Sequence, residues 1–480
     1  MRTDLADLDA TAQAALVRKG DVSPIELVDA AIDRIERLNP RLNAVIHEHF
    51  ERARAEARGT LPDGPFRGVP FLLKDLAGGS SAGDPYHWGT RFLRDAGYRH
   101  PTTAYVVDKF RRSGLVVVGR TNVPELGAWA TTESDAYGPC RNPWNLEHAS
   151  GGSSGGAAAA VASGIVPAAH ASDGGGSIRN PASQCGIIGL KPTRGRVSLG
   201  PDVAEGWAGL AFEFVVTRSV RDTAALLDAV EGTMPGDPYE AARPLRPYVQ
   251  EVGAPPGTLR IGVLGGVEDV AVHPECLAAV ESAAHRLAAL GHHVDESYPA
   301  AIADPNDLGP SVITVVAASQ AHLIDFFGRM LGRPLGAADM DQDNWAITEL
   351  GKGVSTVAYL DALHAMNGFR RRVAAWWADG NDLLLTPTLT GPPPRLGEHR
   401  PIPGAPLVAW QRTGELLRFT MPFNVTGQPA ISLPLHWSAD GLPIGVQLVA
   451  AFGREDLLLR VAAQLEADGA WRGRKPPIHA

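Results

Sequence analysis

Two clusters of glycine and serine, separated by an alanine-rich segment, carry residues that could perform acyl-transfer chemistry. The first cluster is GGSSGG at residues 151–156, and the second is GGGS at residues 174–177. Three consecutive glycines expose successive backbone N–H groups with no side chain in the way. Because Ser177 follows them directly, we expect its hydroxyl to lie beside donors that can hold an oxyanion.

A serine nucleophile needs a base, and Lys74 is the candidate. It ends the apolar run VPFLL at residues 69–73, which is typical of a buried strand. Burial can lower the pKa of a lysine far below its ordinary value of about 10.4, whereas an arginine stays charged. The alternative is a strand-end lysine that reaches solvent or pairs with Asp75.

Other chemistries fit the glycine clusters less well. The first cluster also matches G-x-S-x-G, which would make Ser154 the nucleophile of an α/β-hydrolase-type esterase. That fold favours an HGGG-like run upstream, and the sequence has none before Ser154. The second cluster fails the dinucleotide pattern G-x-G-x-x-G because Arg179 stands at the final glycine position. A flexible linker remains the other interpretation of such runs.

Three motifs in sequence order resemble the amidase signature family of serine hydrolases: GVPFLLKD, GGSSGG and DGGGSIRNPASQCGIIGLKPTRGRVS. The resemblance implies that Lys74 is the base, Ser153 a bridging serine in a cis peptide linkage, and Ser177 the nucleophile. Weaker similarity continues through PFNVTGQPAISLPL near the C-terminus. Over its length the chain most resembles the bacterial members that hydrolyse nylon-type cyclic amide oligomers.

The same resemblance assigns the residues around the nucleophile. It implies that the glycine turn is the oxyanion hole, formed by Gly174, Gly175 and Gly176. It further implies three supporting residues that hold the loop together, namely Ser154, Asp173 and Arg179.

The expected reaction is hydrolysis of a C–N acyl bond through a covalent acyl-enzyme. We expect neutral, lipophilic or aryl amides as substrates, with carbamates (urethanes) and esters sharing the geometry at carbon. Aromatic residues in the later segments suggest an apolar pocket, namely Trp207, Phe212, Phe214, Trp345 and Trp410. The alternative is a glutamine-hydrolysing subunit that passes ammonia to a partner, as in the related tRNA amidotransferases.

Composition limits the partners. The net charge of −9 gives no electrostatic footprint for nucleic acid or an anionic membrane. Three widely spaced cysteines and scattered histidines favour neither a disulfide framework nor a metal site, so we expect no metal and no cofactor. The acidic N-terminus lacks the apolar region of a signal peptide, and we expect a cytoplasmic enzyme whose partner is a small-molecule substrate. A homodimer is compatible with these features.

Alternating strand and helix patterns predict an α/β fold. We expect a single large domain over residues 1–480, with a central twisted sheet, mostly parallel or mixed, and helices on both faces. The signature core spans about 68–200, and a helical insertion at about 304–379 is expected to cover the site. Ser23 and Pro24 begin an early helix that we expect to end at Pro40.

Overall fold

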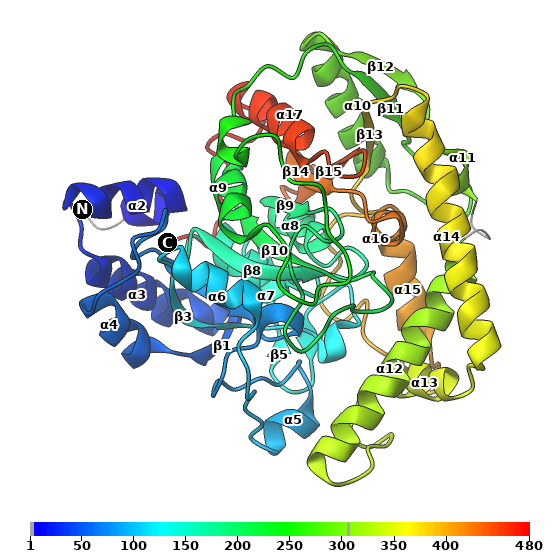
Figure 1. Ribbon diagram of the computed structural model, residues 1–480, viewed down its shortest axis with the longest axis horizontal. Coiled ribbons are helices and arrows are strands. Elements are labelled where there is room, and N and C mark those ends of the chain that lie inside the picture. Colours follow the sequence, from blue (N-terminus) through cyan, green and yellow to red (C-terminus); the bar gives the residue numbers. More distant parts are fainter. Residues whose placement is uncertain (1–3, 305–307) are drawn as a thin grey trace.

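The computed structural model describes residues 4–304 and 308–480 of the chain. Its centre is one large twisted sheet (Figure 1). In spatial order, the eleven strands are β1 (Val45–Glu48), β3 (Val116–Thr121), β2 (Pro70–Lys74), β8 (Ala168–Asp173), β10 (Phe212–Thr217), β9 (Ile188–Lys191), β14 (Ala430–Trp437), β15 (Pro443–Ala450), β13 (Leu383–Pro387), β11 (Arg260–Val263) and β12 (His293–Glu296).

The sheet is mixed, as predicted. Parallel pairs lie toward its two ends, where β3, β2 and β8 run together and β13, β11 and β12 run together. The strands between these groups pair antiparallel, from β8 through β10, β9 and β14 to β15 and β13. Short pairs β4 (Glu133–Ser134) with β5 (Gly138–Pro139) and β6 (Arg141–Asn142) with β7 (Asn145–Ala149) form outside it.

Helices complete the domain. They are α1 (Asp4–Asp7), α2 (Ala10–Lys19), α3 (Pro24–Leu42), α4 (Phe50–Arg58), α5 (Arg91–Asp95), α6 (Tyr105–Arg112), α7 (Gly155–Ala162), α8 (Arg179–Cys185), α9 (Val220–Val230), α10 (Pro274–Ala289), α11 (Ala300–Ala303), α12 (Gly309–Leu331), α13 (Gln342–Lys352), α14 (Thr356–Ala378), α15 (Val408–Leu416), α16 (Met421–Thr426) and α17 (Glu455–Ala467), with 3₁₀ turns η1 (Ala77–Gly79), η2 (Glu125–Gly127) and η3 (Tyr248–Gln250).

Helices cover both faces of the sheet because its strands are apolar on both sides. Along β13, Leu383 and Leu385 belong to the larger hydrophobic core, together with residues of α10 and α17. Leu384 points the other way and packs with residues of α12, α14 and α16. Burial on both faces is the pattern expected of a sheet between helical layers.

The helical insertion lies between β12 and β13. Its helices α12, α13 and α14 stand along the side of the molecule opposite the N-terminal helices (Figure 1), and α12 packs against the other two. Among the residues described, α12 alone is long and apolar enough to cross a membrane by length and composition. Core helices of soluble proteins pass the same test, and 44% of its most apolar window is buried.

One predicted helix boundary was wrong. Helix α3 continues through Pro40 to Leu42. A proline in the last turn costs the helix only one hydrogen bond. Asn43 then closes the helix in a left-handed conformation. Helix α8 begins at Arg179, where the Asn180 N–H donates to Gly176 O at 2.6 Å. Gly186 closes it in a left-handed conformation.

Candidate active site

Two of the three residues proposed for catalysis, Ser153 and Ser177, line one cavity, and the third, Lys74, contacts Ser153. Lys74 is the last residue of β2, Ser153 precedes helix α7, and Ser177 lies in the turn between β8 and α8. Ser153 and Ser177 both line a cavity of about 1160 Å³. Strands β2 and β8 are parallel neighbours, so residues at their carboxyl ends meet at the same edge of the sheet.

The amine of Lys74 lies in a pocket of hydroxyl groups. Its Nζ donates to Ser153 Oγ at 2.8 Å, to Ser172 Oγ at 2.8 Å and to the Ser172 carbonyl at 3.3 Å. Lys74 has no exposed surface, and desolvation by burial lowers its pKa to about 7. Its amine can therefore be neutral near pH 7 and accept a proton.

The structure removes both alternatives for Lys74. The side chain does not reach solvent, and Asp75 pairs with a different residue, since Arg120 Nε donates to Asp75 Oδ1 at 3.0 Å. The same guanidinium donates from Nη2 to the Lys74 carbonyl at 3.1 Å. Arg120 thus holds the end of β2 in place while Lys74 turns toward the serines.

The two serines of the first cluster lie in different surroundings. The Gly152–Ser153 peptide bond is cis, and Asn180 Nδ2 donates to the Gly152 carbonyl at 2.8 Å. Ser154 is fully buried at the start of α7, where its Oγ donates to the Ser172 carbonyl at 3.3 Å. This position suits a structural residue and not the nucleophile of an esterase.

The glycine turn is held by its carbonyl groups and by Asp173. Thr420 Oγ1 donates to Gly175 O at 2.6 Å, and Gly176 N–H donates to Asp173 Oδ1 at 2.7 Å. Gly176 has φ of +138°, and a Cβ there would lie 2.4 Å from Thr420 Oγ1. A side chain therefore does not fit, and the Gly176 N–H is already committed to Asp173.

Asp173 and Arg179 form a fully buried ion pair beneath the turn. Arg179 Nε and Nη2 donate to the two carboxylate oxygens at 3.0 and 2.9 Å. This guanidinium contributes to holding the pKa of Asp173 at about 2 against the opposing effect of desolvation. Asp173 also accepts the Gly176 N–H, so the ion pair contacts the glycine turn through this carboxylate.

The C-terminal residues that complete this support were not predicted from the sequence. Arg179 Nη2 donates to Asn424 Oδ1 at 2.6 Å, and Arg179 Nη1 donates to Gln447 Oε1 at 2.8 Å. Asn424 Nδ2 returns a hydrogen bond to Asp173 Oδ1 at 2.8 Å. Asn424 lies within the motif PFNVTGQPAISLPL, which was noticed only as weak similarity.

A group of potential metal ligands lies close to Lys74. His47, Asp75 and His87 have ligand atoms within 4.8 Å of one another. Burial lowers the pKa of His47 to about 3, so its imidazole is neutral. Asp75, however, already carries the hydrogen bond from Arg120 and another from the His87 N–H at 3.1 Å. Arg120 already neutralises the carboxylate charge that a metal cation would need. The group is therefore better explained as a buried ion pair with neighbouring histidines than as a metal site.

The cavity has mainly aromatic and aliphatic walls. Its apolar lining comes from the N-terminal half, from the loop before β10 and from helices α12 and α14, and includes Trp88, Trp207, Phe326, Phe327, Leu363 and Met366. The insertion thus forms one wall of the cavity. Polar lining residues include Asp202, Glu205, Glu213, Asn367 and Arg370.

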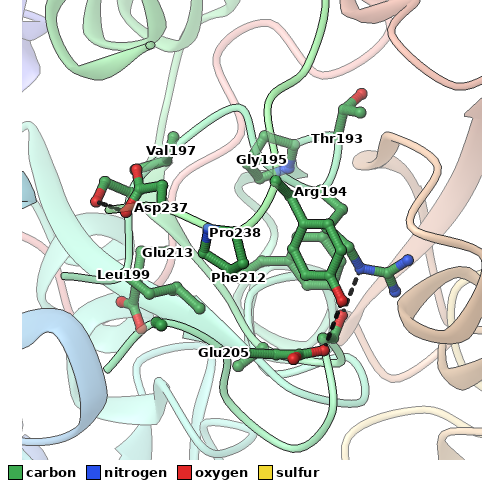
Figure 2. A pocket seen from close by; sticks show the side chains of 16 residues that line it. Thr193, Arg194, Gly195, Val197, Leu199, Glu205, Phe212, Glu213, Asp237 and Pro238 are labelled. Carbon is green, nitrogen blue, oxygen red and sulfur yellow. Dashed lines mark hydrogen bonds between the residues drawn. The ribbon is translucent and has the colours of Figure 1, made fainter. Parts of the chain in front are cut away.

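The other aromatic residues singled out from the sequence lie elsewhere. Phe212 lines a separate small cavity of about 30 Å³ beside Arg194 and Asp237 (Figure 2). Phe214 is buried in the core. Trp345 and Trp410 are partly buried against other hydrophobic clusters. Of these five aromatic residues, all of which the structure describes, Trp207 is therefore the one that lines the large cavity.

This fold and this arrangement of residues define an amide hydrolase. The amidase family profile matches residues 26–459, and the chain belongs to that family. It is 47% identical over 479 residues to a 6-aminohexanoate-cyclic-dimer hydrolase of Paenarthrobacter ureafaciens, covering 98% of this chain and 96% of that protein.

Solved structures agree with this assignment. A structure of 6-aminohexanoate cyclic dimer hydrolase superposes with a TM-score of 0.95 at 46% identity, covering 99% of both chains. A bacterial aryl acylamidase of the amidase signature enzymes has a TM-score of 0.87 at 28% identity, covering 97% of this chain and 96% of its own. The enzyme is thus an amidase, similar over nearly its full length to hydrolases of amide bonds.

Proposed function

We propose that this amidase hydrolyses neutral, lipophilic amides through a Ser177 acyl-enzyme, with Lys74 as the base and Ser153 as the proton carrier. The observation that supports the proposal most is the buried contact of 2.8 Å between Lys74 Nζ and Ser153 Oγ, at a cavity that Ser177 also lines. A neutral lysine can take a proton through this contact.

The reaction begins with attack on the substrate carbonyl. Ser177 Oγ bonds to the carbonyl carbon, its proton passes to Ser153, and the Ser153 proton passes to Lys74. The negative charge that develops on oxygen is stabilised by N–H groups of the glycine turn. Because Gly176 N–H donates to Asp173, we assign this role to the N–H groups of Gly174, Gly175 and Ser177, with Gly176 fixing the turn.

Collapse of the intermediate breaks the C–N bond. The proton returns from Lys74 through Ser153 to the leaving nitrogen, and the amine departs. A water molecule then attacks the acyl carbon, gives its proton to the same relay, and Ser177 leaves as the protonated alcohol. Amides need this proton delivery because an unprotonated nitrogen is a poor leaving group.

The cavity supports the choice of substrate. It is larger than the range of about 300–1,000 Å³ typical of small-molecule sites, and its walls are largely apolar. A relative that is 47% identical to this chain is a 6-aminohexanoate-cyclic-dimer hydrolase, and the cyclic dimer is a neutral amide. We extend the class to anilides and urethanes because their carbonyl carbons pass through the same tetrahedral geometry.

Substitution of the nucleophile tests the mechanism. Ser177→Ala is expected to lose nearly all turnover of a p-nitroanilide, with Ser154→Ala as the matched control. A folded Ser177→Ala enzyme that keeps about a tenth of kcat/KM, a loss of about 1.4 kcal/mol, would exclude Ser177 as nucleophile. Intact-mass analysis after mixing with an activated ester should show one acyl group on the wild-type protein and none on this variant.

A substrate panel tests the specificity. We expect the 6-aminohexanoate cyclic dimer and an anilide to have far higher kcat/KM than free glutamine, whose charged groups do not suit apolar walls. A clear preference for glutamine would favour the ammonia-donating subunit instead.

A further inference from the structure

A hydrogen-bonded chain of buried groups lies behind Lys74 and has no place in the proton relay just described. The Lys74 N–H donates to His170 Nδ1 at 3.3 Å, and His170 Nε2 lies 2.8 Å from Glu213 Oε2. The other carboxylate oxygen, Oε1, accepts the Gly78 N–H at 3.0 Å. His170 has no exposed surface and Glu213 has 1%.

The directions of these bonds fix the charges. Because Nδ1 of His170 accepts the Lys74 N–H, this nitrogen carries the lone pair, and the ring proton lies on Nε2. That proton is donated to Glu213, whose second oxygen also accepts an N–H. A carboxylate with donors on both oxygens is suited to be ionised in a buried place. Glu213 is therefore a fixed negative charge inside the protein.

Strand pairing places this charge on the same side of the sheet as the lysine amine. Glu213 on β10 lies directly opposite Ser172 on β8, so their side chains share a face. Ser172 Oγ is the group that Lys74 Nζ contacts at 2.8 Å. Glu213 lines the large cavity and also the small one, where Figure 2 labels it near Leu199.

The other acidic groups near Lys74 have arginine partners. Asp173 pairs with Arg179 and Asp75 pairs with Arg120. Glu213, in contrast, is paired in the described part of the chain with an imidazole that carries one shared proton. Its charge is thus the least compensated of the three.

We propose that Glu213 is a positioning residue for amide hydrolysis, an inference that rests on the function proposed above. Through His170 it holds the main chain of Lys74, and its negative charge opposes loss of the proton from the Lys74 amine. The effect matters because a base works best when its affinity for protons suits the working pH. Burial lowers the pKa of Lys74 to about 7. Two negative charges act in the opposite direction, and the effect of Glu213 on this pKa is larger than that of Asp173. Without Glu213, the lysine would be a weaker base.

The test is the pH dependence of kcat/KM for an anilide, measured for wild type and Glu213→Gln between pH 5 and 9.5. Glutamine keeps the size of the side chain and removes the charge. We expect the midpoint of the acidic limb to move down by about one pH unit. The ratio of variant to wild-type activity should therefore be higher at pH 5.5 than at pH 9. An unchanged midpoint, with activity reduced equally at every pH, would overturn the proposal.

Two further variants sharpen the result. Glu205→Gln removes another carboxylate from the cavity wall, and its midpoint should match wild type whatever its effect on KM. Glu213→Asp keeps the charge and shortens the reach to His170, so we expect a lower kcat with the midpoint retained. If Glu213→Gln does not fold, Glu213→Asp alone decides. A midpoint that moves down by a full pH unit in this variant, which keeps the charge, would contradict the proposed effect of the charge on Lys74.

The same experiments separate this inference from the mechanism on which it depends. If Lys74 is not the base, Lys74→Arg will keep near-normal activity and the assignment of the relay fails. If Lys74→Arg is inactive and the Glu213→Gln midpoint stays at the wild-type pH, the relay stands and only the role of Glu213 fails.

Discussion

Replacing Lys74 with methionine should abolish activity and change how the stability of the fold depends on pH. In the unfolded chain the lysine has a pKa near 10.5, and in the fold burial lowers it to about 7. Between these values the unfolded chain holds a proton that the folded protein has released. The free energy of unfolding of the wild type therefore gains a contribution that rises with pH across this window.

The magnitude follows from the two values. Each pH unit inside the window contributes about 1.4 kcal/mol, and the whole window corresponds to about 5 kcal/mol. Below pH 7 the folded protein carries a buried ammonium at that cost. Methionine has a similar length and no charge, so the Lys74→Met variant lacks the contribution. Its stability relative to wild type should fall by about 3 kcal/mol between pH 7.5 and 9.5.

Urea unfolding of both proteins at several pH values measures this difference. The slope is the quantity of interest, because methionine also loses the hydrogen bonds to Ser153 and Ser172 at every pH. Lys352→Met, which removes a half-exposed lysine, controls for the loss of one positive charge. A stability difference that stays constant from pH 7.5 to 9.5, or a slope equal to that of the control, would refute a depressed pKa at Lys74.

Three further predictions concern the surroundings of the site. Asp173→Ala should lower the free energy of unfolding by about 3–5 kcal/mol because it leaves a buried guanidinium unpaired; a urea titration showing less than about 1 kcal/mol would contradict this. Gly176→Ala should reduce kcat/KM about 100-fold by displacing the glycine turn, whereas Gly232→Ala, where φ is also positive but the space is open, should leave kcat/KM unchanged. Burial and the neighbouring Asp341 raise the pKa of Glu125 from 4.5 to about 8, so the stability that this carboxyl contributes below pH 4.5 is lost progressively as the pH rises to about 8. The melting temperature of Glu125→Gln should accordingly gain on wild type from pH 5 to 8, and a constant offset would count against this.

Residues close together in sequence were the easiest part of the site to predict. Ser177 and its glycine turn form one continuous segment, and Lys74 ends a run whose apolar character predicts a buried strand. Local chemistry therefore proposed them as candidates before the fold was known, and the family resemblance added Ser153. That Ser153 and Ser177 line one cavity and that Lys74 contacts Ser153 could not be predicted from the sequence alone.

Partners that come from distant strands escaped prediction. His170 and Glu213 meet only because β10 pairs antiparallel with β8, and Asn424 reaches Arg179 from about 245 residues away. Nothing in a single residue's neighbours along the chain predicts such pairing. Strand β10, with the sequence FEFVVT, was missed although its aromatic and β-branched residues favour a strand.

The place of helices α11–α14 in the chain bears on how such enzymes diversify. The chain leaves the sheet after β12 and returns in β13, and both strands pair with β11. The excursion therefore begins and ends at two strands that share one neighbour in the sheet. The residues proposed for catalysis come from the first half of the chain, while α12 and α14 supply one wall of the cavity. Substitutions confined to these helices would therefore change the shape of the cavity and leave the proposed catalytic residues in place.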